Sequence, residues 1–256
     1  MKLDITDFEA TGKYLRDLHP SLIVHCAAQR SPDKVDTEYE KTCCLNVEAS
    51  GNLASLAKEV GAKMIYISTD YVFDGKNPPY HEGDKTNPLN KYGLTKLQGE
   101  EAVMKSYPDA IILRIGILYG EVEHLEESAV TTLFSTLKDK NHEKTVSDYE
   151  IRYPTHINDI AHILVGLAEK CDSSGEVKGI YHWCGKEAMT KFKMVQEMSN
   201  ALSIPMDHVK PDSSPQSGAV TRPYNAQLAT SRIDKLGLGC HTPFKVGITE
   251  CLKPYL

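Results

Sequence analysis

The sequence predicts an α/β fold in which helices cover a mainly parallel β-sheet, and three observations lead to this prediction. Short apolar runs rich in β-branched residues recur along the first half of the chain, as in "SLIVHCAA", "KMIYIS" and "AIILRIGILY". Segments with a helical spacing of apolar residues lie between these runs. The resulting order of strand, helix, strand, helix and strand is typical of right-handed βαβ units in a parallel sheet.

The first half of the chain divides into alternating elements with readable ends. A capping box of Thr6 and Glu9 predicts the start of a short helix. Gly61 predicts the end of a long helix that begins near Thr37. We expect helices at residues 6–18, 37–60 and 91–107 and strands at residues 21–28, 63–68 and 110–119.

Beyond Gly120 the alternation loosens. We expect helices near residues 128–140, 158–170 and 190–202 and a strand at residues 179–185, followed by loops with many prolines. This change of pattern predicts a second, smaller lobe. The expected fold is therefore α/β, a Rossmann-type doubly wound parallel sheet with a small mixed C-terminal lobe.

Composition sets the class of protein. A chain of 256 residues can bury a sizeable core, and its net charge of −6 gives no basic field for nucleic acid. Its apolar runs are far shorter than the roughly 20 residues of a membrane span, and the N-terminus shows no apolar signal segment. Seven scattered cysteines fit a reduced intracellular protein better than a disulfide framework, so we expect a cytoplasmic location.

One expected feature of a dinucleotide-binding sheet is missing. Such a sheet normally begins with a strand, a glycine-rich turn and a helix whose N-terminal amides hold the pyrophosphate. The chain contains no G-x-G-x-x-G or G-x-x-G-x-x-G motif, and "GLGC" at residues 237–240 lacks the third glycine. The first predicted elements already look like the middle of a sheet, so we expect the first βαβ unit with its glycine-rich turn to be absent from this chain.

A tyrosine and a lysine stand four residues apart in "KYGLTK", at the start of a predicted helix. Tyr92 and Lys96 then share one helix face, where an ammonium would lower the pKa of the phenol and assist proton exchange with a carbonyl oxygen. A hydroxyl at the preceding strand end, Thr69 or Ser68, could hold the same oxygen. The pair alone is a weak signal, but its place after a strand ending in S-T-D favours a functional origin.

These motifs resemble those of a known family. "VHCAA", "ISTDYVFDG", "PLNKYGLTK" and "RPYNAQL" resemble the extended short-chain dehydrogenase/reductases of the dTDP-4-dehydrorhamnose reductase type. A narrower resemblance, to the regulatory β subunits of methionine adenosyltransferase, rests on "LNVEASGNLA", "YGEVEHLEESAVT", "YPTHINDIA", "MTKFKM" and the arginine, Arg30, that follows "IVHCAA". This narrower resemblance covers almost the whole chain.

The narrower resemblance implies a non-catalytic role. Such a subunit binds the methionine adenosyltransferase catalytic subunit, modulates S-adenosylmethionine synthesis and binds NADP(H). The resemblance divides the chain into a truncated NADP-binding part at about residues 1–120 and a lobe that binds substrate or partner at about residues 121–256. The resembling subunits carry a C-terminal tail that enters the catalytic subunit, and this chain stops at "ECLKPYL", where such a tail would start.

The resemblance also implies a set of cofactor contacts. The implied cofactor-binding residues are Asp4, Ile5, Cys26, Arg30, Tyr92, Lys96 and Leu118. Asp4 and Ile5 match a pair beside adenine, and Cys26 and Arg30 match a strand end flanking the nucleotide. The tyrosine and lysine match the pair at the nicotinamide ribose, and the leucine lies beside the nicotinamide. Because a glycine-rich turn supplies much of the pyrophosphate binding, its absence would weaken the affinity for NADP(H).

An active reductase is the alternative interpretation. Thr69, Tyr92 and Lys96 would then form a catalytic triad for NADPH-dependent reduction of a keto-sugar nucleotide, with the tyrosine as proton donor. The resembling reductases carry a tryptophan where this chain has Ile117 and a glycine where it has Arg152, so the usual deoxysugar ligand is disfavoured. A fragment that binds neither ligand nor partner is a third interpretation.

Other conspicuous residues favour structural roles. Cys43 and Cys44 are adjacent in a helix and are expected to pack in the core. His182 and Cys184 share one face of a predicted strand, but no further ligand stands at metal spacing, so no metal site is expected. The acidic run "EVEHLEES" fits either a solvated helix start or part of a partner surface.

Overall fold

A computed structural model describes residues 3–174, 177–215 and 220–256 of the chain, which fall into two compact units. Unit 1 consists of Met1–Asp74, Glu82–Arg114 and Leu164–His182, and unit 2 consists of Gly75–His81, Ile115–Ile163 and Trp183–Leu256. Helix α7 (Ile157–Ser174) contributes residues to both units. Each unit is described by itself below.

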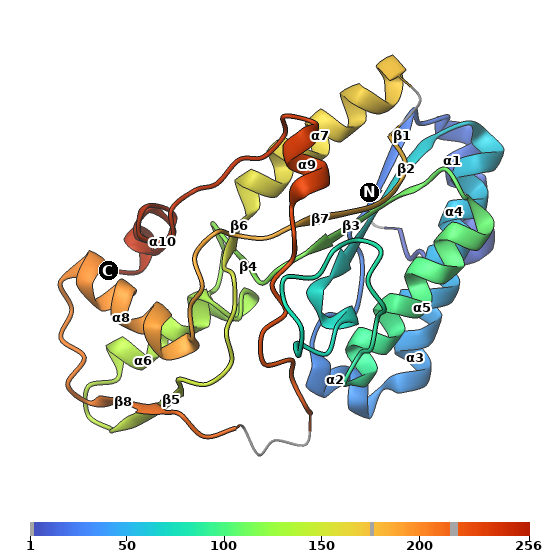
Figure 1. The fold of residues 1–256 in the computed structure, drawn as a ribbon. Coiled ribbons are helices and arrows are strands. Elements are labelled where there is room, and N and C mark those ends of the chain that lie inside the picture. Colours follow the sequence, from blue (N-terminus) through green and yellow to red (C-terminus); the bar gives the residue numbers. More distant parts are fainter. Residues whose placement is uncertain (1–2, 175–176, 216–219) are drawn as a thin grey trace. The chain divides into compact units, whose positions relative to one another are not determined.

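The main sheet has four parallel strands, and it confirms the predicted Rossmann-type α/β fold (Figure 1). Its strands, in spatial order, are β1 (Leu22–His25), β2 (Lys63–Thr69), β3 (Ile111–Ile115) and β7 (Gly179–Trp183). Strands β1 and β2 pair in parallel with Leu22 opposite Lys63. Every residue of β3 is buried, as expected for a central strand covered on both faces.

Helices of unit 1 lie over one face of this sheet. They are α1 (Phe8–Leu18), α2 (Pro32–Thr37), α3 (Tyr39–Cys43), the π-helix η1 (Cys44–Glu48), α4 (Ala49–Val60) and α5 (Lys91–Ser106). One core cluster joins Leu15 of α1, Leu53 of α4 and Val103 of α5 to Met64 and Tyr66 of β2. The two β2 residues are two positions apart, so they point to the same face, which α1, α4 and α5 therefore cover (Figure 1).

Two local predictions about these helices were wrong. The cap of α1 is Asp7, whose side chain accepts from the amide of Ala10, while Thr6 donates to Asp4 instead of capping. The single long helix predicted for residues 37–60 is divided into α3, η1 and α4, with a short helix before it. Its end is confirmed, because Gly61 adopts a φ of +76° and its amide bonds to the last turn of α4.

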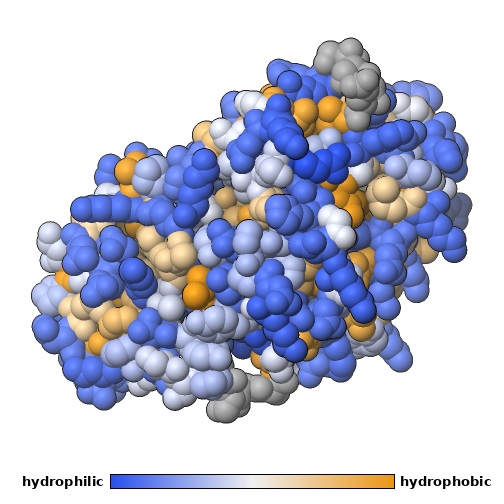
Figure 2. Space-filling model, in the orientation of Figure 1, coloured by the Kyte–Doolittle hydropathy of each residue, from blue (hydrophilic) through white to orange (hydrophobic). Residues whose placement is uncertain are grey.

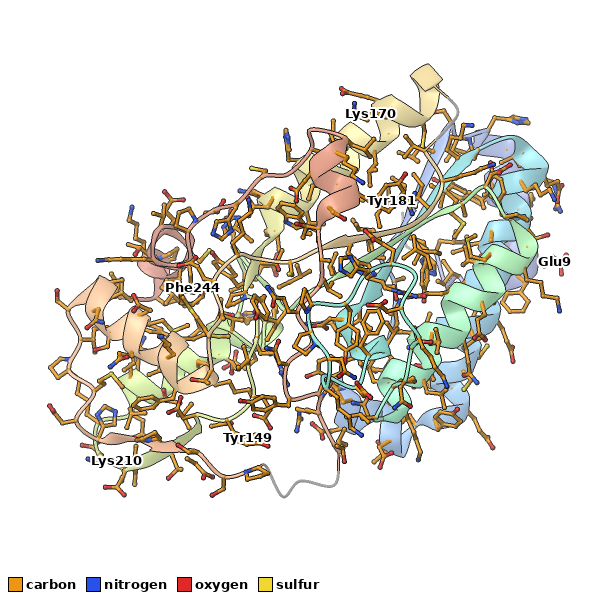
Figure 3. The ribbon with its side chains drawn as sticks, in the orientation of Figure 1. Glu9, Tyr149, Lys170, Tyr181, Lys210 and Phe244 are labelled. Carbon is orange, nitrogen blue, oxygen red and sulfur yellow. The ribbon has the colours of Figure 1, made fainter. Side chains whose placement is uncertain are left out.

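Unit 2 has two short parallel pairs of strands and its own core. Strand β4 (Leu118–Tyr119) pairs with β6 (Thr155–His156), and β5 (Lys144–Ser147) pairs with β8 (Val209–Asp212). Its helices are α6 (Phe134–Lys138), α8 (Lys191–Leu202), α9 (Ser231–Lys235), α10 (Phe244–Leu252) and the first part of α7. Phe244, at the start of α10 in Figure 3, packs in the core with its ring centroid 5.1 Å from that of Tyr119.

The strand predicted at residues 110–119 is interrupted. Gly116 leaves the ladder after β3, with its amide donating to the carbonyl of Trp183 at 3.2 Å. The carbonyl of Ile117 accepts from the amide of Thr155 at 2.8 Å, and the chain then continues as β4. The helices predicted near residues 158–170 and 190–202 and the strand at 179–185 are confirmed. The helix predicted at 128–140 is shorter and comprises a 3₁₀ turn, η4 (Thr131–Leu133), followed by α6.

The surface is mostly polar. Figure 2 shows hydrophilic side chains over most of the visible face, with apolar ones scattered among them. Over residues 3–174, 177–215 and 220–256, no helix has the length and apolar character needed to cross a bilayer. The same residues contain no group of three or more histidine, cysteine, aspartate or glutamate side chains placed to hold a metal ion.

Candidate functional site

The first turn of α5 presents the predicted tyrosine and lysine. Asn90 caps the helix, its side chain accepting from the amide of Gly93 at 2.9 Å. A Cβ at Gly93 would collide with the carbonyl oxygen of Tyr71, so glycine lets the helix start lie directly against the segment that follows β2. Tyr92 and Lys96 therefore face the carboxyl end of the sheet, where ligands of open α/β folds bind.

Thr69 ends β2 beside Tyr92. The threonine side chain is close enough to the phenol to lower its pKa, and its Oγ1 donates to Asp70 Oδ1 at 3.2 Å. The threonine Oγ1 also accepts from the amide of Tyr71 at 3.2 Å and so caps the turn after the strand. The rings of Tyr71 and Tyr92 meet edge to face with centroids 5.7 Å apart. This packing holds the Tyr92 phenol in one place, with its hydroxyl on the strand end.

Lys96 is buried and bonded to neutral groups. Its ammonium donates to the hydroxyl of Tyr66 at 2.7 Å and to the carbonyl oxygen of Ile67 at 2.8 Å. It also lies 4.0 Å from the centroid of the Tyr66 ring, a cation–π contact. Burial lowers the pKa of Lys96 from 10.5 to about 7, although the negative charge of Glu100 opposes this shift. The site therefore contains a lysine whose charge changes near neutral pH.

The expected effect of Lys96 on Tyr92 was wrong. Burial raises the pKa of the Tyr92 phenol above its ordinary value, and the charges of Asp70 and Tyr71 raise it further. The cation that lowers this pKa is Arg30, whereas Lys96 turns toward Tyr66. Two residues four positions apart share a helix face, but the nearest acceptor decides where a long side chain ends.

The structure also separates Thr69 from Ser68. Ser68 donates to a carboxylate oxygen of Glu100, which is itself held by two guanidinium nitrogens of Arg114, one at 2.7 Å. All three side chains are buried, and the ring of Phe73 lies 5.1 Å from the guanidinium carbon. Because Ser68 belongs to this buried network, Thr69 is the hydroxyl that reaches Tyr92.

Asn46 belongs to the site and was missed at the sequence level. It lies in η1, and its amide nitrogen donates to the carbonyl of Gln29 and to Thr95 Oγ1, both at 3.2 Å. Its side-chain oxygen accepts from the amide of Gln29 at 2.8 Å. It thus ties the loop after β1 to α5. A polar residue at a buried helical position was the available signal, and π-turns inside helices are frequent at functional sites.

The other residues implied by the resemblance are distributed unevenly. Cys26 and Arg30 follow β1, where Cys26 lies within electrostatic reach of Lys96 and Arg30 within that of Tyr92. Asp4 interacts electrostatically with Lys41 and Cys44, and Ile5 packs on the core cluster of unit 1. Leu118 begins β4 in unit 2, so its expected place beside the nicotinamide stays a prediction.

A family match covers the whole chain. The family model for the RmlD substrate binding domain matches residues 1–256. The chain belongs to this family. The resemblance predicted from "ISTDYVFDG" and "PLNKYGLTK" is therefore confirmed. In this chain the two motifs lie at the end of β2 and at the start of α5.

Curated relatives similar to this chain include a methionine adenosyltransferase subunit and a reductase. Methionine adenosyltransferase 2 subunit beta of Bos taurus is 48% identical over 256 residues, which is 100% of this chain and 76% of the relative. The dTDP-4-dehydrorhamnose reductase of Mycolicibacterium smegmatis is 30% identical over 238 residues, 92% of this chain and 70% of the relative. The narrower resemblance to the β subunits is thus confirmed at higher identity.

Solved structures agree with the fold. The dTDP-4-dehydrorhamnose reductase of Bacillus anthracis, solved in complex with NADP, superposes with a TM-score of 0.87 at 26% identity. The comparison covers 98% of this chain and 86% of that one. Nicotinamide nucleotides are therefore ligands of structural neighbours in this family.

The residues of unit 1 fit such a nucleotide. Within the described residues Lys96 forms no ion pair, so its ammonium has donors directed only at neutral acceptors and can serve ribose hydroxyls. Thr69 and Tyr92 supply a second hydroxyl pair on the same strand end. A reduced nicotinamide would supply a hydride at such a site. The residues that would hold the nucleotide are Thr69, Tyr92, Lys96, Cys26 and Arg30.

Proposed function

We propose that this chain is a regulatory subunit that binds a methionine adenosyltransferase catalytic subunit and modulates S-adenosylmethionine synthesis, with NADP(H) held in unit 1. In this role the nucleotide stabilises the fold of the subunit, and its turnover is not required. The chain acts in the cytoplasm as part of a hetero-oligomer and of one-carbon metabolism.

The observation that carries this proposal is the 48% identity, over the full chain, to a relative named as a subunit of methionine adenosyltransferase. The geometry of Lys96 supports the part played by the cofactor. A buried lysine whose acceptors are neutral lowers the stability of the folded chain. Such a residue is typical of functional sites, where a ligand uses its donors.

Arg152 bears on the choice between regulation and catalysis. Its guanidinium is buried in unit 2 and donates to the carbonyl oxygens of Ile151 and Pro223 at 2.8 and 2.9 Å. The side chain thus holds together backbone segments at the position where the resembling reductases have a glycine. This use of the position favours a structural role over recognition of a deoxysugar.

The test is co-purification of the chain with the catalytic subunit, followed by assay of S-adenosylmethionine synthesis with and without NADPH. We expect a stable complex whose synthesis kinetics differ from those of the free catalytic subunit. Lys96→Met should weaken the response to NADPH, whereas Lys105→Met, the same change at an exposed position of α5, should leave it unchanged. Absence of a complex under both conditions would contradict the proposal.

The second candidate is a reductase of keto-sugar nucleotides. The closeness of Thr69 to Tyr92, beside Lys96, favours it, together with the 30% identity to the Mycolicibacterium smegmatis reductase. In this role Tyr92 would donate the proton and Thr69 would orient the carbonyl. NADPH oxidation on addition of a dTDP-keto-sugar, abolished by Tyr92→Phe, would support this function, and no oxidation would exclude it.

A further inference from the structure

A run of buried polar groups leads away from Lys96 inside unit 1. The Lys96 ammonium donates to the hydroxyl of Tyr66 at 2.7 Å, and Ser50 lies close enough to act on the pKa of that phenol. Ser50 Oγ donates to the main-chain carbonyl of Asn46 at 2.8 Å and lies 2.9 Å from Nε2 of His25. All five residues are buried, Tyr66, Ser50 and Asn46 completely.

The direction of the hydrogen bonds follows from counting protons. An ammonium can only donate, so Tyr66 accepts from Lys96. The single proton of Ser50 goes to the Asn46 carbonyl, and His25 then donates from Nε2. The Tyr66 oxygen therefore presents a lone pair to the lysine.

A glycine in α5 makes room for this run. A Cβ at Gly99 would lie 2.5 Å from the carbonyl oxygen of Asn46 and closer still to the Tyr66 hydroxyl. Gly99 stands inside a helix, where glycine is unfavourable unless a neighbour needs the space. The close approach is therefore an independent sign that the Tyr66 hydroxyl is held at a fixed place beside Lys96.

We propose that Tyr66 is the positioning residue of the nucleotide site: its hydroxyl holds the Lys96 ammonium in place and stabilises its charge. The inference rests on the proposed binding of NADP(H), since Lys96 is the residue that would meet the ribose. Tyr66 itself acts only through Lys96 and is not a catalytic residue. Neither Tyr66 nor Ser50 was among the site residues expected from the sequence.

Other groups around Lys96 cannot replace this hydroxyl. From α5, Glu100 favours the ammonium, but its carboxylate is bonded to Arg114 of β3 and to Ser68 of β2. From the end of β1, Cys26 acts on Lys96 electrostatically and His25 lies within range of its charge. The Ile67 carbonyl is the other neutral acceptor. Tyr66 is thus the side-chain acceptor of the Lys96 ammonium, and Tyr66→Phe removes its hydroxyl without removing a charge.

The experiment is an NMR titration of lysine side chains labelled with ¹³C at Cε in the free protein, with the Lys96 signal assigned by its loss in Lys96→Met. Tyr66→Phe keeps the ring against the ammonium and removes only the hydroxyl. Loss of one charge-assisted hydrogen bond should lower the titration midpoint of Lys96 by about one pH unit or more. Tyr14→Phe, a half-buried tyrosine on the same core cluster, should leave the midpoint unchanged.

A calorimetric titration with NADP⁺ provides the functional readout. At neutral pH the dissociation constant of Tyr66→Phe should rise roughly tenfold, and the difference from wild type should shrink where both chains hold Lys96 charged. An unchanged Lys96 midpoint in Tyr66→Phe overturns the proposal. Gly99→Ala, whose new methyl group would meet the Tyr66 hydroxyl, must shift the midpoint in the same direction, and it decides the matter if Tyr66→Phe does not fold.

The two proposals fail in different ways. If wild type does not bind NADP⁺ but Tyr66→Phe still shifts the Lys96 midpoint, Tyr66 positions Lys96 and the proposed cofactor role is wrong. If wild type binds NADP⁺ and the midpoint does not move, the cofactor role stands and the positioning role of Tyr66 is refuted.

Discussion

Replacing Lys96 by methionine should make the folded chain more stable at about pH 6, although it removes a residue of the proposed nucleotide site. Methionine has a similar length and no charge, so it can occupy the same buried space. The gain arises because the ammonium is buried among neutral groups, with Tyr66 and Ile67 as its hydrogen-bond acceptors. Stability and ligand binding are opposed at this position.

The size of the effect follows from the pKa of Lys96. Burial lowers it from 10.5 to about 7, so between these values the unfolded chain holds more protons than the folded one. Wild-type stability therefore rises with pH through this window, and the full penalty is present below about pH 7. At about 1.4 kcal/mol per factor of ten, that penalty is at most roughly 4–5 kcal/mol. Loss of the two hydrogen bonds offsets part of it, which leaves an expected gain of about 1–3 kcal/mol.

Urea unfolding of wild type and Lys96→Met at about pH 6, 8 and 10 measures this gain. The difference between the two chains should be largest at the lowest pH and should shrink as Lys96 loses its proton. Lys105→Met, at an exposed position of the same helix, should change stability by less than about 0.5 kcal/mol at every pH. A destabilised Lys96→Met chain at pH 6, or a difference that does not depend on pH, would refute this reasoning.

Three further predictions concern the same unit. Gly99→Ala should lower the free energy of unfolding by about 1–3 kcal/mol, because the new methyl group meets the Tyr66 hydroxyl and a carbonyl oxygen, and urea unfolding measures the loss. Glu100→Gln should destabilise by about 3–5 kcal/mol in the same assay, since it leaves the charge of Arg114 buried without its partner. Burial lowers the pKa of His25 from 6.5 to about 4, so stability present above pH 6.5 is lost as pH falls through that window. His25→Gln should reduce this loss of folding stability at acid pH by up to about 3 kcal/mol, as measured by unfolding followed by circular dichroism.

Matched controls separate these effects from nonspecific ones. Gly83→Ala has open space around the new methyl group and should change stability by less than about 0.5 kcal/mol. Glu59→Gln breaks an exposed pair with Arg16, and its effect on urea unfolding should be far smaller than that of Glu100→Gln. If Gly99→Ala and Glu100→Gln behave like their controls, the buried network does not have the geometry described.

Much of unit 1 could be predicted from local pattern alone. The strand ending at Thr69 and the helix beginning at Lys91 follow from an apolar run and a start signal, and both were found where expected. Gly61 ends its helix because only a residue without a Cβ adopts a positive φ freely. These features depend on a few neighbouring residues, which is why the sequence shows them.

The hydrogen-bond partners within the site could not be predicted in the same way. Lys96 reaches Tyr66 on another element rather than Tyr92 on its own helix, since tertiary packing puts that hydroxyl closer. Asn46 lies in the π-helix η1 and Ser50 in the first turn of α4, and the boundary between these helices has no sequence signature. Gly99 was a local hint beside the polar side chain of Asn46, because a glycine inside a helix requires a reason.

The most direct test of the account is a calorimetric titration of NADP⁺ into the 256-residue chain, alone and with a stoichiometric amount of the methionine adenosyltransferase catalytic subunit. We predict one nucleotide site per chain in the complex, lost in Lys96→Met and retained in Lys105→Met. Binding of equal strength by wild type and Lys96→Met, or no binding by wild type in the complex, would contradict the claim that unit 1 holds a nicotinamide nucleotide through Lys96.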